Sequence, residues 1–571
     1  MAPRRLSLTS SLAKLHGDER TVGAPLHSAE YIAMRRTRLF GATGTVLMGI
    51  GALGAGARPV VQDPTFGVRL LNLPSRMQSV SLTMTTTGAV MMALAWLMMG
   101  RFALGPRRIS RSQLDRTLLL WMLPLLVAPP MYSKDVYSYL AQSQITRLGL
   151  DPYKVGPAPG LGLDHVFTLS VPSLWRETPA PYGPLFLWLG RGVSELTGEN
   201  VVAAVLVHRV VVLAGVSLIV WATPRLARRC GVAEVTALWL GAANPLLLMH
   251  LVAGIHNEAL MLGLMLTGTE ISLRGIASAG RLLPGWEPRS RVQWSAYQPL
   301  ALVSAGTVLI TLSSQVKLPG LLALGFTTMA LAHREGGTLR AFLRCSVFTG
   351  TLALAVMVFI GGISKLGFGW LFTLGTANVV RSWMSPPTLL ALGTGQVGIL
   401  LGLGDHTTAV LSLTRTIGVL VITVVVSWLL IAVLRGRLNP VGGLGVALGA
   451  TVLLFPVVQP WYLLWAIIPL AAWATRPRFR IATIVVTLVV GIFGPTANGD
   501  RFALFQIIDA TVASTVIVVL LIALTLHRLP WRYIPGTNEH YSGQDDDPID
   551  TPEGLRTDRP VPPSSRPTPG A

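Results

Sequence analysis

The stretch Pro129-Pro130-Met131-Tyr132-Ser133-Lys134-Asp135-Val136-Tyr137-Ser138-Tyr139 follows a long apolar run, residues 118–127, and turns it into a polar loop. An apolar run of this kind is typical of a helix in a membrane, and the polar residues after it indicate where the chain meets water. The break leaves one carboxylate, Asp135, at the membrane surface with three tyrosines near it. A charged side chain at the lipid boundary is costly unless it has a partner or a function. Asp135 is therefore the first candidate site residue.

The composition places the whole chain in the membrane class. Of its 571 residues, 51% are hydrophobic and 13% are charged, and the mean hydropathy is +0.57, whereas a soluble domain carries about a quarter charged residues. We predict an all-α polytopic membrane protein with about 14 transmembrane helices. The predicted spans cover residues 39–57, 78–100, 115–131, 201–222, 233–250, 254–272, 298–313, 317–332, 341–363, 412–434, 441–457, 461–475, 480–495 and 503–526.

The predicted domain organisation follows from these spans. A cytoplasmic N-terminal tail covers residues 1–38, a transmembrane domain covers residues 39–526, and a disordered cytoplasmic tail, rich in proline towards its end, covers residues 527–571. Within the transmembrane domain, residues 132–200 are expected to form a large first extracytoplasmic loop that carries interfacial helices.

The net charge of +20 comes largely from arginines that gather in alternate short turns. This positive-inside pattern predicts a multi-pass plasma membrane protein with a cytoplasmic N-terminus, and it explains the charge without nucleic-acid binding. Two further apolar runs, residues 183–197 and 387–403, would disturb the alternation if they crossed the membrane, so we interpret both as re-entrant or interfacial helices. The unusual polar groups then collect on the outer face, which predicts an extracytoplasmic active site. Cys230 and Cys345 lie beside arginine-rich turns, and no structural disulfide is expected.

Asp135 has two interpretations. As a general base it would take the proton from an acceptor hydroxyl while a sugar leaves its phosphate. As a structural residue, either Asp135 or Ser133 would cap a helix over residues 136–148 by accepting from the first backbone amides. Position alone favours neither interpretation, although the neighbouring tyrosines add aromatic rings of the kind found at sugar sites and lipid interfaces.

Other polar and aromatic residues are expected to line or shape a site on the same outer side. These candidate substrate-binding residues are Tyr137, Asp151, Tyr182, His256, Asn257, Glu258, Gln459, Trp461 and Tyr462. Several have structural alternatives: Asp151 before a proline suits a turn, Asn257 with Glu258 suits a helix start, and aromatic residues suit an interfacial belt. A metal needs more ligands than one histidine and one glutamate at this spacing, so no metal site is predicted.

Candidate phosphate-binding residues are isolated cations in apolar surroundings, namely Lys317, Arg381, Arg415 and Arg501. Lys317 would bind a phosphate as a point charge, or its ammonium would simply reach the membrane surface. A soluble sugar nucleotide is not supported, because no glycine-rich phosphate loop lies between a strand and a helix. A sugar donor would therefore have to arrive on a lipid.

Five motifs together carry a resemblance to a known family. They are Ser133-Lys134-Asp135-Val136-Tyr137-Ser138-Tyr139, Gly149-Leu150-Asp151-Pro152-Tyr153, Pro181-Tyr182-Gly183-Pro184, Gly254-Ile255-His256-Asn257-Glu258 and Gln459-Pro460-Trp461-Tyr462. In this order, over roughly residues 35–530, the chain resembles the actinobacterial polyprenol-phosphate-mannose-dependent α-(1→6)-mannosyltransferases. These are membrane glycosyltransferases of the GT-C fold that build the mannan backbone of lipomannan and lipoarabinomannan. Within the family the chain looks closest to the proximal type, which starts that backbone.

The resemblance implies a polyprenyl-phosphate-mannose donor and a mannosylated phosphatidylinositol or related glycolipid acceptor. It implies transfer with inversion, no cofactor, and Asp135 as the general base. Lys134 stands where some GT-C enzymes carry a second acid, which argues against a metal held by adjacent carboxylates. The alternatives are a GT-C transferase that uses another polyprenyl-phosphate sugar, a lipid-linked sugar flippase or transporter, and a structural subunit of an envelope complex.

Overall fold

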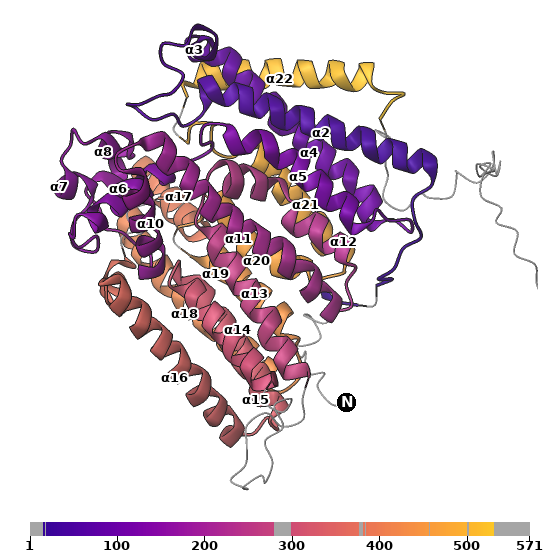
Figure 1. Ribbon diagram of the computed structural model, residues 1–571, viewed down its shortest axis with the longest axis vertical. Helices are drawn as coiled ribbons and strands as arrows, with labels where there is room; N and C mark the ends of the chain where they lie inside the picture. The colour runs from indigo at the N-terminus through magenta and orange to yellow at the C-terminus, as the bar shows by residue number, and fades with distance from the viewer. Residues whose placement is uncertain are drawn as a thin grey trace, which may run out of the picture. The chain divides into compact units, whose positions relative to one another are not determined.

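In the computed structural model, the described residues are 15–17, 19–278, 298–375, 381–382, 384–455, 457–499 and 502–529. All of them belong to one compact unit, and they form helices with no strand beyond an isolated bridge between Ala24 and Arg107. Figure 1 shows the long helices stacked side by side, with the short helices α6, α7, α8 and α10 together at one side. The predicted C-terminal tail lies almost entirely outside the described residues, which end at Leu529.

The helices, in chain order, are α2 (Ser28–Ala55), α3 (Arg69–Arg76), α4 (Gln78–Leu104), α5 (Arg111–Val127), α6 (Asp135–Arg147), α7 (Pro157–Leu161), α8 (Val166–Ser170), α9 (Ser173–Arg176), α10 (Pro184–Thr197), α11 (Val201–Arg229), α12 (Glu234–Ala237), η2 (Leu238–Ala242), η3 (Leu247–Ala253), α13 (Glu258–Ala277), α14 (Gln298–Ser314), η5 (Leu318–Leu321), α15 (Leu322–Arg334), α16 (Leu339–Ser364), η6 (Gly369–Thr373), α17 (Pro386–Leu400), α18 (Thr407–Leu434), α19 (Pro440–Leu454), η8 (Pro460–Tyr462), α20 (Leu463–Ala471), α21 (Pro477–Phe493) and α22 (Leu504–Leu524).

Each of the fourteen predicted spans contains a helix, but their number as membrane crossings is not confirmed. Within the described residues, seven helices are long and apolar enough to cross a bilayer: α2, α4, α11, α13, α16, α18 and α22. An eighth crossing arises if the bent pair Glu234–Ala242 and Leu247–Ala253 counts as one span. The remaining predicted spans form shorter helices, such as the 9-residue α20. The protein is a multi-pass helical membrane protein in any of these counts.

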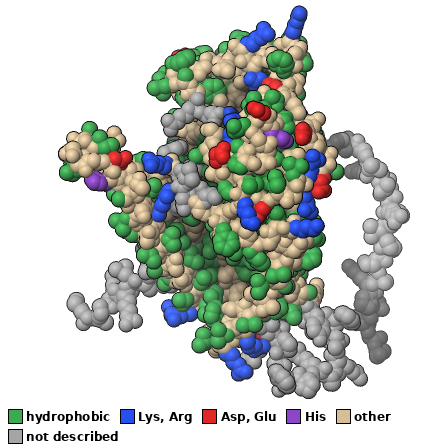
Figure 2. All heavy atoms as spheres, turned by 90° about the vertical axis from the view of Figure 1, so that its left-hand side faces the viewer, with side chains coloured by type: hydrophobic (Ala, Val, Ile, Leu, Met, Phe, Trp, Pro, Cys, Tyr) green, Lys and Arg blue, Asp and Glu red, His purple; other side chains and the backbone are tan. Residues whose placement is uncertain are grey.

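The two runs that we interpret as re-entrant or interfacial form α10 and α17, with 14 and 15 residues. Neither is among the helices long enough to cross, so their predicted role stays open to test. Figure 2 shows hydrophobic side chains over much of one face, while the lowest part of that face carries Lys and Arg among the coloured charged side chains. Lys and Arg also appear at the upper end of this face (Figure 2).

The long helices pack closely because small residues face one another at their crossings. A Cβ atom at Gly44 of α2 would lie 2.7 Å from the carbonyl oxygen of Gly88 in α4, and one at Gly88 would lie 2.3 Å from the oxygen of Gly44. The pair Gly268 and Gly306 joins α13 to α14 in the same way. Lipid tails are as apolar as leucine, so membrane helices associate through such close packing rather than through hydrophobic exclusion.

The bend between η2 and η3 follows from Asn244-Pro245. Proline cannot donate a backbone hydrogen bond, so it interrupts the helical ladder, and the two halves meet at 60°. The Asn244 side chain compensates: its Nδ2 donates to the Leu240 carbonyl, and its Oδ1 accepts from the Leu246 amide at 2.9 Å. The bend positions the chain that leads from η3 to α13 and carries His256.

The large loop after α5 is fixed to the bundle by buried polar contacts. Arg209, inside α11, donates to the carbonyls of Leu126 and Ala128, which lie at the end of α5 beyond its last helical bonds. Ser194 of α10 donates to the Gln144 side chain of α6 at 2.6 Å. The loop is therefore an ordered layer of short helices that holds α6 in place.

Candidate active site

The N-cap residue of α6 is Lys134, which makes no side-chain cap bond, so neither Ser133 nor Asp135 is the N-cap that the structural interpretation predicts. α6 begins at Asp135, within one residue of the predicted start, and Ser133 Oγ accepts from the Asp135 backbone amide at 3.0 Å. The Asp135 carboxylate is thus not needed as the cap. It lies 3.6 Å from Nδ1 of His256, with 25% of its side chain exposed.

The surroundings of Asp135 raise its pKa to about 6. Burial is the largest cause, because it disfavours the charged carboxylate, and the negative charge of Glu258 adds to it. The ammonium of Lys317 and the hydrogen bond from Ser133 act in the opposite direction. A carboxyl group with such a pKa can exchange a proton near neutral pH.

A buried ion pair lies beside Asp135. Lys317, which precedes η5, donates to Oε1 of Glu258, the first residue of α13, whose side chain is 1% exposed. The Lys317 ammonium also donates to the Tyr462 hydroxyl at 3.2 Å and lies 4.5 Å from the centre of that ring. Trp461 Nε1 donates to Glu258 Oε1 at 3.2 Å. Four predicted site residues from three distant parts of the chain therefore form one cluster.

His256 connects Asp135 to this ion pair. Its ring stacks on Trp461 with centroids 3.6 Å apart, and its Nδ1 lies 3.9 Å from Glu258 Oε2. Burial, followed by the positive charge of Lys317, holds the pKa of His256 well below its usual value, so the imidazole is neutral. Neither ring nitrogen has a hydrogen-bond partner in the part of the chain that the structure describes.

Unpaired polar atoms mark the same region as a binding site. The side-chain amides of Asn257 and Gln315 are buried with both N and O unpartnered among the described residues. Unsatisfied buried amides are costly, and at a functional site they indicate where a polar ligand or water binds. Asn257 is a predicted substrate-binding residue, whereas Gln315, two residues from Lys317, was predicted only as one of the unusual polar groups of the outer face.

Tyr182 is held in place by two contacts with other tyrosines of the large loop. Tyr153 donates its hydroxyl to the Tyr182 carbonyl at 3.0 Å, and the Tyr139 ring meets the Tyr182 ring edge-on with centroids 5.2 Å apart. The next residue, Gly183, donates its backbone amide to the Val316 carbonyl at 3.2 Å. The Pro181–Pro184 motif therefore docks the loop on the segment that carries Lys317.

This docking requires glycine at position 183. A Cβ atom there would lie 2.2 Å from the carbonyl oxygen of Gln315, a distance that backbone atoms cannot relieve without moving apart. We expect Gly183→Ala to separate the loop from Lys317, lower the yield of folded protein and reduce transfer activity. Gly192→Ala on α10 is the matched control, because a Cβ at Gly192 meets no atom within 4 Å. Size-exclusion profiles and activity per folded protein would test this, and equal behaviour of the two variants would contradict it.

Two of the predicted substrate-binding residues, Tyr137 and Asp151, make contacts outside the cluster. Tyr137 donates its hydroxyl to the Ala57 carbonyl at 2.6 Å and is 1% exposed. Asp151 accepts from the Tyr153 amide at 3.0 Å and lies 3.5 Å from Lys154, as its turn interpretation predicts. A substrate-binding role for either stays a prediction. Gln459 precedes η8, and its backbone carbonyl accepts from the Tyr462 amide.

The predicted phosphate-binding cations are not all brought together. Lys317 is part of the cluster, through Glu258 and Tyr462. Arg381 is exposed beside Ser382, whose hydroxyl donates to the Val458 carbonyl near Gln459. Arg415 lies on α18, and Arg501 is outside the described residues. The described residues include no group of three or more metal-ligating side chains suited to an ion.

These features define a class: a multi-pass helical membrane protein in which a loop carboxylate adjoins a buried lysine, an acid and stacked aromatic rings. The family model described as the N-terminal domain of alpha-(1->6)-mannopyranosyltransferase matches residues 38–333, and the model of the MptB C-terminal domain matches residues 387–523. The chain belongs to the alpha-(1->6)-mannopyranosyltransferase family, which confirms the family resemblance of the five motifs.

Relatives support the same conclusion. The chain is 77% identical, over 94% of its length and 96% of the relative, to a probable alpha-(1->6)-mannopyranosyltransferase of Mycolicibacterium smegmatis. It is 74% identical to an alpha-(1->6)-mannopyranosyltransferase of Mycobacterium tuberculosis, with 93% and 94% of the two chains covered. Alpha-(1->6)-mannopyranosyltransferase A of the same organism is 33% identical over 81% of this chain and 85% of the relative. No solved structure matches the chain.

Proposed function

We propose that this protein transfers mannose from polyprenyl-phosphate mannose to a mannosylated phosphatidylinositol or related glycolipid, and forms α-(1→6) linkages of the lipomannan and lipoarabinomannan backbone with inversion. The observation that carries the proposal is the position of Asp135, a partly exposed carboxylate beside the buried pair of Lys317 and Glu258. The family sets the linkage. The charges of the site favour a sugar phosphate as donor.

In the proposed reaction, the 6-hydroxyl oxygen of the acceptor mannose attacks C1 of the donor mannose. The new C–O bond forms as the bond between C1 and the phosphate oxygen breaks, and polyprenyl phosphate leaves with the electron pair. Asp135 takes the proton of the attacking hydroxyl, so charge is balanced without a cofactor or a metal. Inversion follows because a single displacement exchanges the face of C1 that carries oxygen.

Lys317 is the proposed phosphate-binding residue. An ammonium group has three N–H donors, and those of Lys317 have two partners among the described side chains, Glu258 and Tyr462. With 18% of the side chain exposed, a donor remains for a phosphate oxygen. A cation there stabilises the negative charge that grows on the leaving phosphate in the transition state.

The prenyl chain of the donor would lie in an apolar cavity of about 360 Å³ between α15 and α16. Its lining includes Leu321, the last residue of η5, the short helix that Lys317 precedes. Its lining is mainly apolar, with Leu324, Met329 and Leu354 among the residues. An apolar path from a phosphate-binding lysine suits a lipid phosphate better than a water-soluble nucleotide.

The proposed role of Asp135 predicts a pH dependence. Below its pKa of about 6 the carboxyl group holds a proton and cannot accept another, so kcat/KM should rise with pH along a limb of that midpoint. The negative charge of Glu258 raises this pKa, and Glu258→Gln should move the limb to lower pH. Initial rates between pH 4.5 and 8 in detergent solution would measure the limb of the wild type and that of the variant. A flat profile, or a limb that moves upwards, would contradict the assignment.

The donor is tested with isolated membranes, labelled polyprenyl-phosphate mannose and short α-(1→6)-mannosides as acceptors. Transfer that depends on this donor, with inversion and an α-(1→6) product by NMR, is the expected result. Transfer only from another polyprenyl-phosphate sugar would favour the related transferase, and movement of the lipid-linked sugar without transfer would favour a flippase. Preference for the shortest acceptors would support the proximal type.

A further inference from the structure

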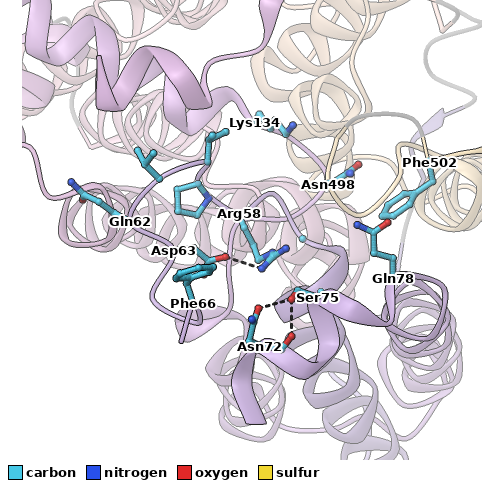
Figure 3. A pocket seen from close by; sticks show the side chains of 15 residues that line it. Arg58, Gln62, Asp63, Phe66, Asn72, Ser75, Gln78, Lys134, Asn498 and Phe502 are labelled. Carbon is cyan, nitrogen blue, oxygen red and sulfur yellow. Dashed lines mark hydrogen bonds and ion pairs between the residues drawn. The ribbon is translucent and has the colours of Figure 1, made fainter. Parts of the chain in front are cut away.

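A polar cavity of about 810 Å³ adjoins the candidate active site without containing its ion pair. The cavity is lined mainly by the chain between α2 and α3 and by residues of α3 (Figure 3). Gln78, the first residue of α4, and the more distant Lys134 and Asn498 also line it. Lys134 directly precedes Asp135, so the two sites meet at the start of α6. None of His256, Glu258 and Lys317 lines the cavity.

We infer that this cavity binds the glycan of the acceptor, a neutral α-(1→6)-linked mannoside, and presents its terminal hydroxyl to Asp135. The inference rests on the proposed function, because an acceptor site presupposes glycosyl transfer. An inverting displacement needs the attacking oxygen and the leaving phosphate on opposite sides of C1. With phosphate at Lys317, the acceptor therefore has to approach from another side of Asp135, and the cavity provides that approach.

The two charged side chains between α2 and α3 pair with each other, which favours a neutral ligand along this wall of the cavity, while Lys134 lines another part of it. Arg58 is paired with Asp63 at 2.7 Å, and Asp63 also accepts from the amide and hydroxyl of Thr65 (Figure 3). A guanidinium occupied in this way is a poor site for a second anion, because the new ligand would have to replace a carboxylate already held. The charged groups of this wall are thus matched to each other.

The remaining lining suits sugar hydroxyls. Asn72 and Gln78 present side-chain amides that can both donate and accept, and Ser75 donates to Asn72 Oδ1 (Figure 3). Phe66 and Phe502 add two aromatic rings, and Phe66 is 82% exposed although it lies in an ordered segment. Polar groups with aromatic surface in a cavity of several hundred Å³ form a common kind of small-molecule site.

The cavity wall is held in place before any ligand binds. Val60 donates its amide to the Ser170 hydroxyl at 3.0 Å, and Gln62 both accepts from the Val201 amide and donates to the Glu199 carbonyl. These bonds anchor the wall to the large loop, while Tyr137 anchors it to α6 through Ala57. Tyr137 would therefore act on the sugar site by positioning its wall.

The inference can be tested without a donor. Saturation-transfer NMR would measure the binding of α-(1→6)-mannotetraose to the purified full chain. Asn72→Ala, Phe66→Ala and the cavity-filling Gln78→Trp should each weaken binding about tenfold or more, the scale of one lost favourable contact. The matched controls are Leu70→Ala, which is 82% exposed like Phe66, and Val80→Trp, because neither residue lines the cavity. Wild-type binding by the controls is the expected result.

The inference is overturned if mannotetraose does not bind the wild type, or if the cavity variants and the controls bind it equally. Displacement of mannotetraose by inositol phosphate at low concentration would also overturn it, in favour of a headgroup site. Kinetics separate it from the proposed function. If the wild type transfers mannose and the cavity variants keep its acceptor KM, only the cavity assignment fails. If the wild type transfers no mannose but the cavity variants still lose glycan binding, only the donor proposal fails.

Discussion

Replacing Asp135 with asparagine is expected to lower kcat for mannose transfer by about 10²–10⁴-fold, the usual contribution of a positioned general base. Asparagine keeps the size of the side chain but cannot take the proton of the acceptor hydroxyl. The variant should fold, because the bond from the Asp135 backbone amide to Ser133 does not involve the carboxylate and the substitution removes a negative charge near Glu258. Transfer from labelled polyprenyl-phosphate mannose, normalised to the amount of folded protein, measures the effect.

Asp164→Asn is the matched control for this experiment. Asp164 is an exposed acid in the same large loop and has no contact with the cluster among the described residues. It should retain wild-type kcat and KM. Undiminished transfer by Asp135→Asn would remove Asp135 from the chemistry and transfer the role of base to Glu258, the other carboxylate near His256.

The sequence could predict the helical membrane class because apolar runs of bilayer length do not depend on tertiary contacts. It could not predict the number of crossings, because short helices such as α20 and the bent η2–η3 pair depend on neighbours for their length and direction. Local signals also sufficed for turns: Asp151 caps a turn, and α13 begins at Glu258 as expected. Each of these features is fixed within about four residues of the chain.

The site was predictable only in part, because its residues come together through contacts between distant parts of the chain. Lys317, Glu258 and Trp461 were each selected as unusual residues, but no sequence pattern joins positions separated by up to 203 residues. Tyr137 looked like a sugar-binding ring from its neighbours, whereas its hydroxyl bonds to Ala57, a contact across 80 residues. Gln315 was noted as an unusual polar group of the outer face but not as a site residue, because its burial without a partner appears only in the folded chain.

The second large effect concerns the buried pair of Lys317 and Glu258. Lys317→Met should lower the free energy of unfolding by about 3–5 kcal/mol, because it leaves a buried carboxylate without its partner. Glu258 is 1% exposed, so water cannot replace the ammonium. Transfer should also be lost, since methionine has no charge to stabilise the leaving phosphate. Thermal unfolding in detergent and transfer rates per folded protein measure the two losses separately.

The double variant Lys317→Met/Glu258→Gln separates structure from function. With both charges removed, no unpaired ion stays buried, and most of the lost stability should return. Activity should not return, because the proposed phosphate-binding ammonium is absent and the leaving phosphate loses its stabilising charge. A double variant that regains both stability and transfer would show that the pair only supports the fold. If the double variant regains stability but shows a raised KM for the donor and a low kcat, Lys317 binds the phosphate. Its contact with Glu258 then holds the ammonium in place for the reaction.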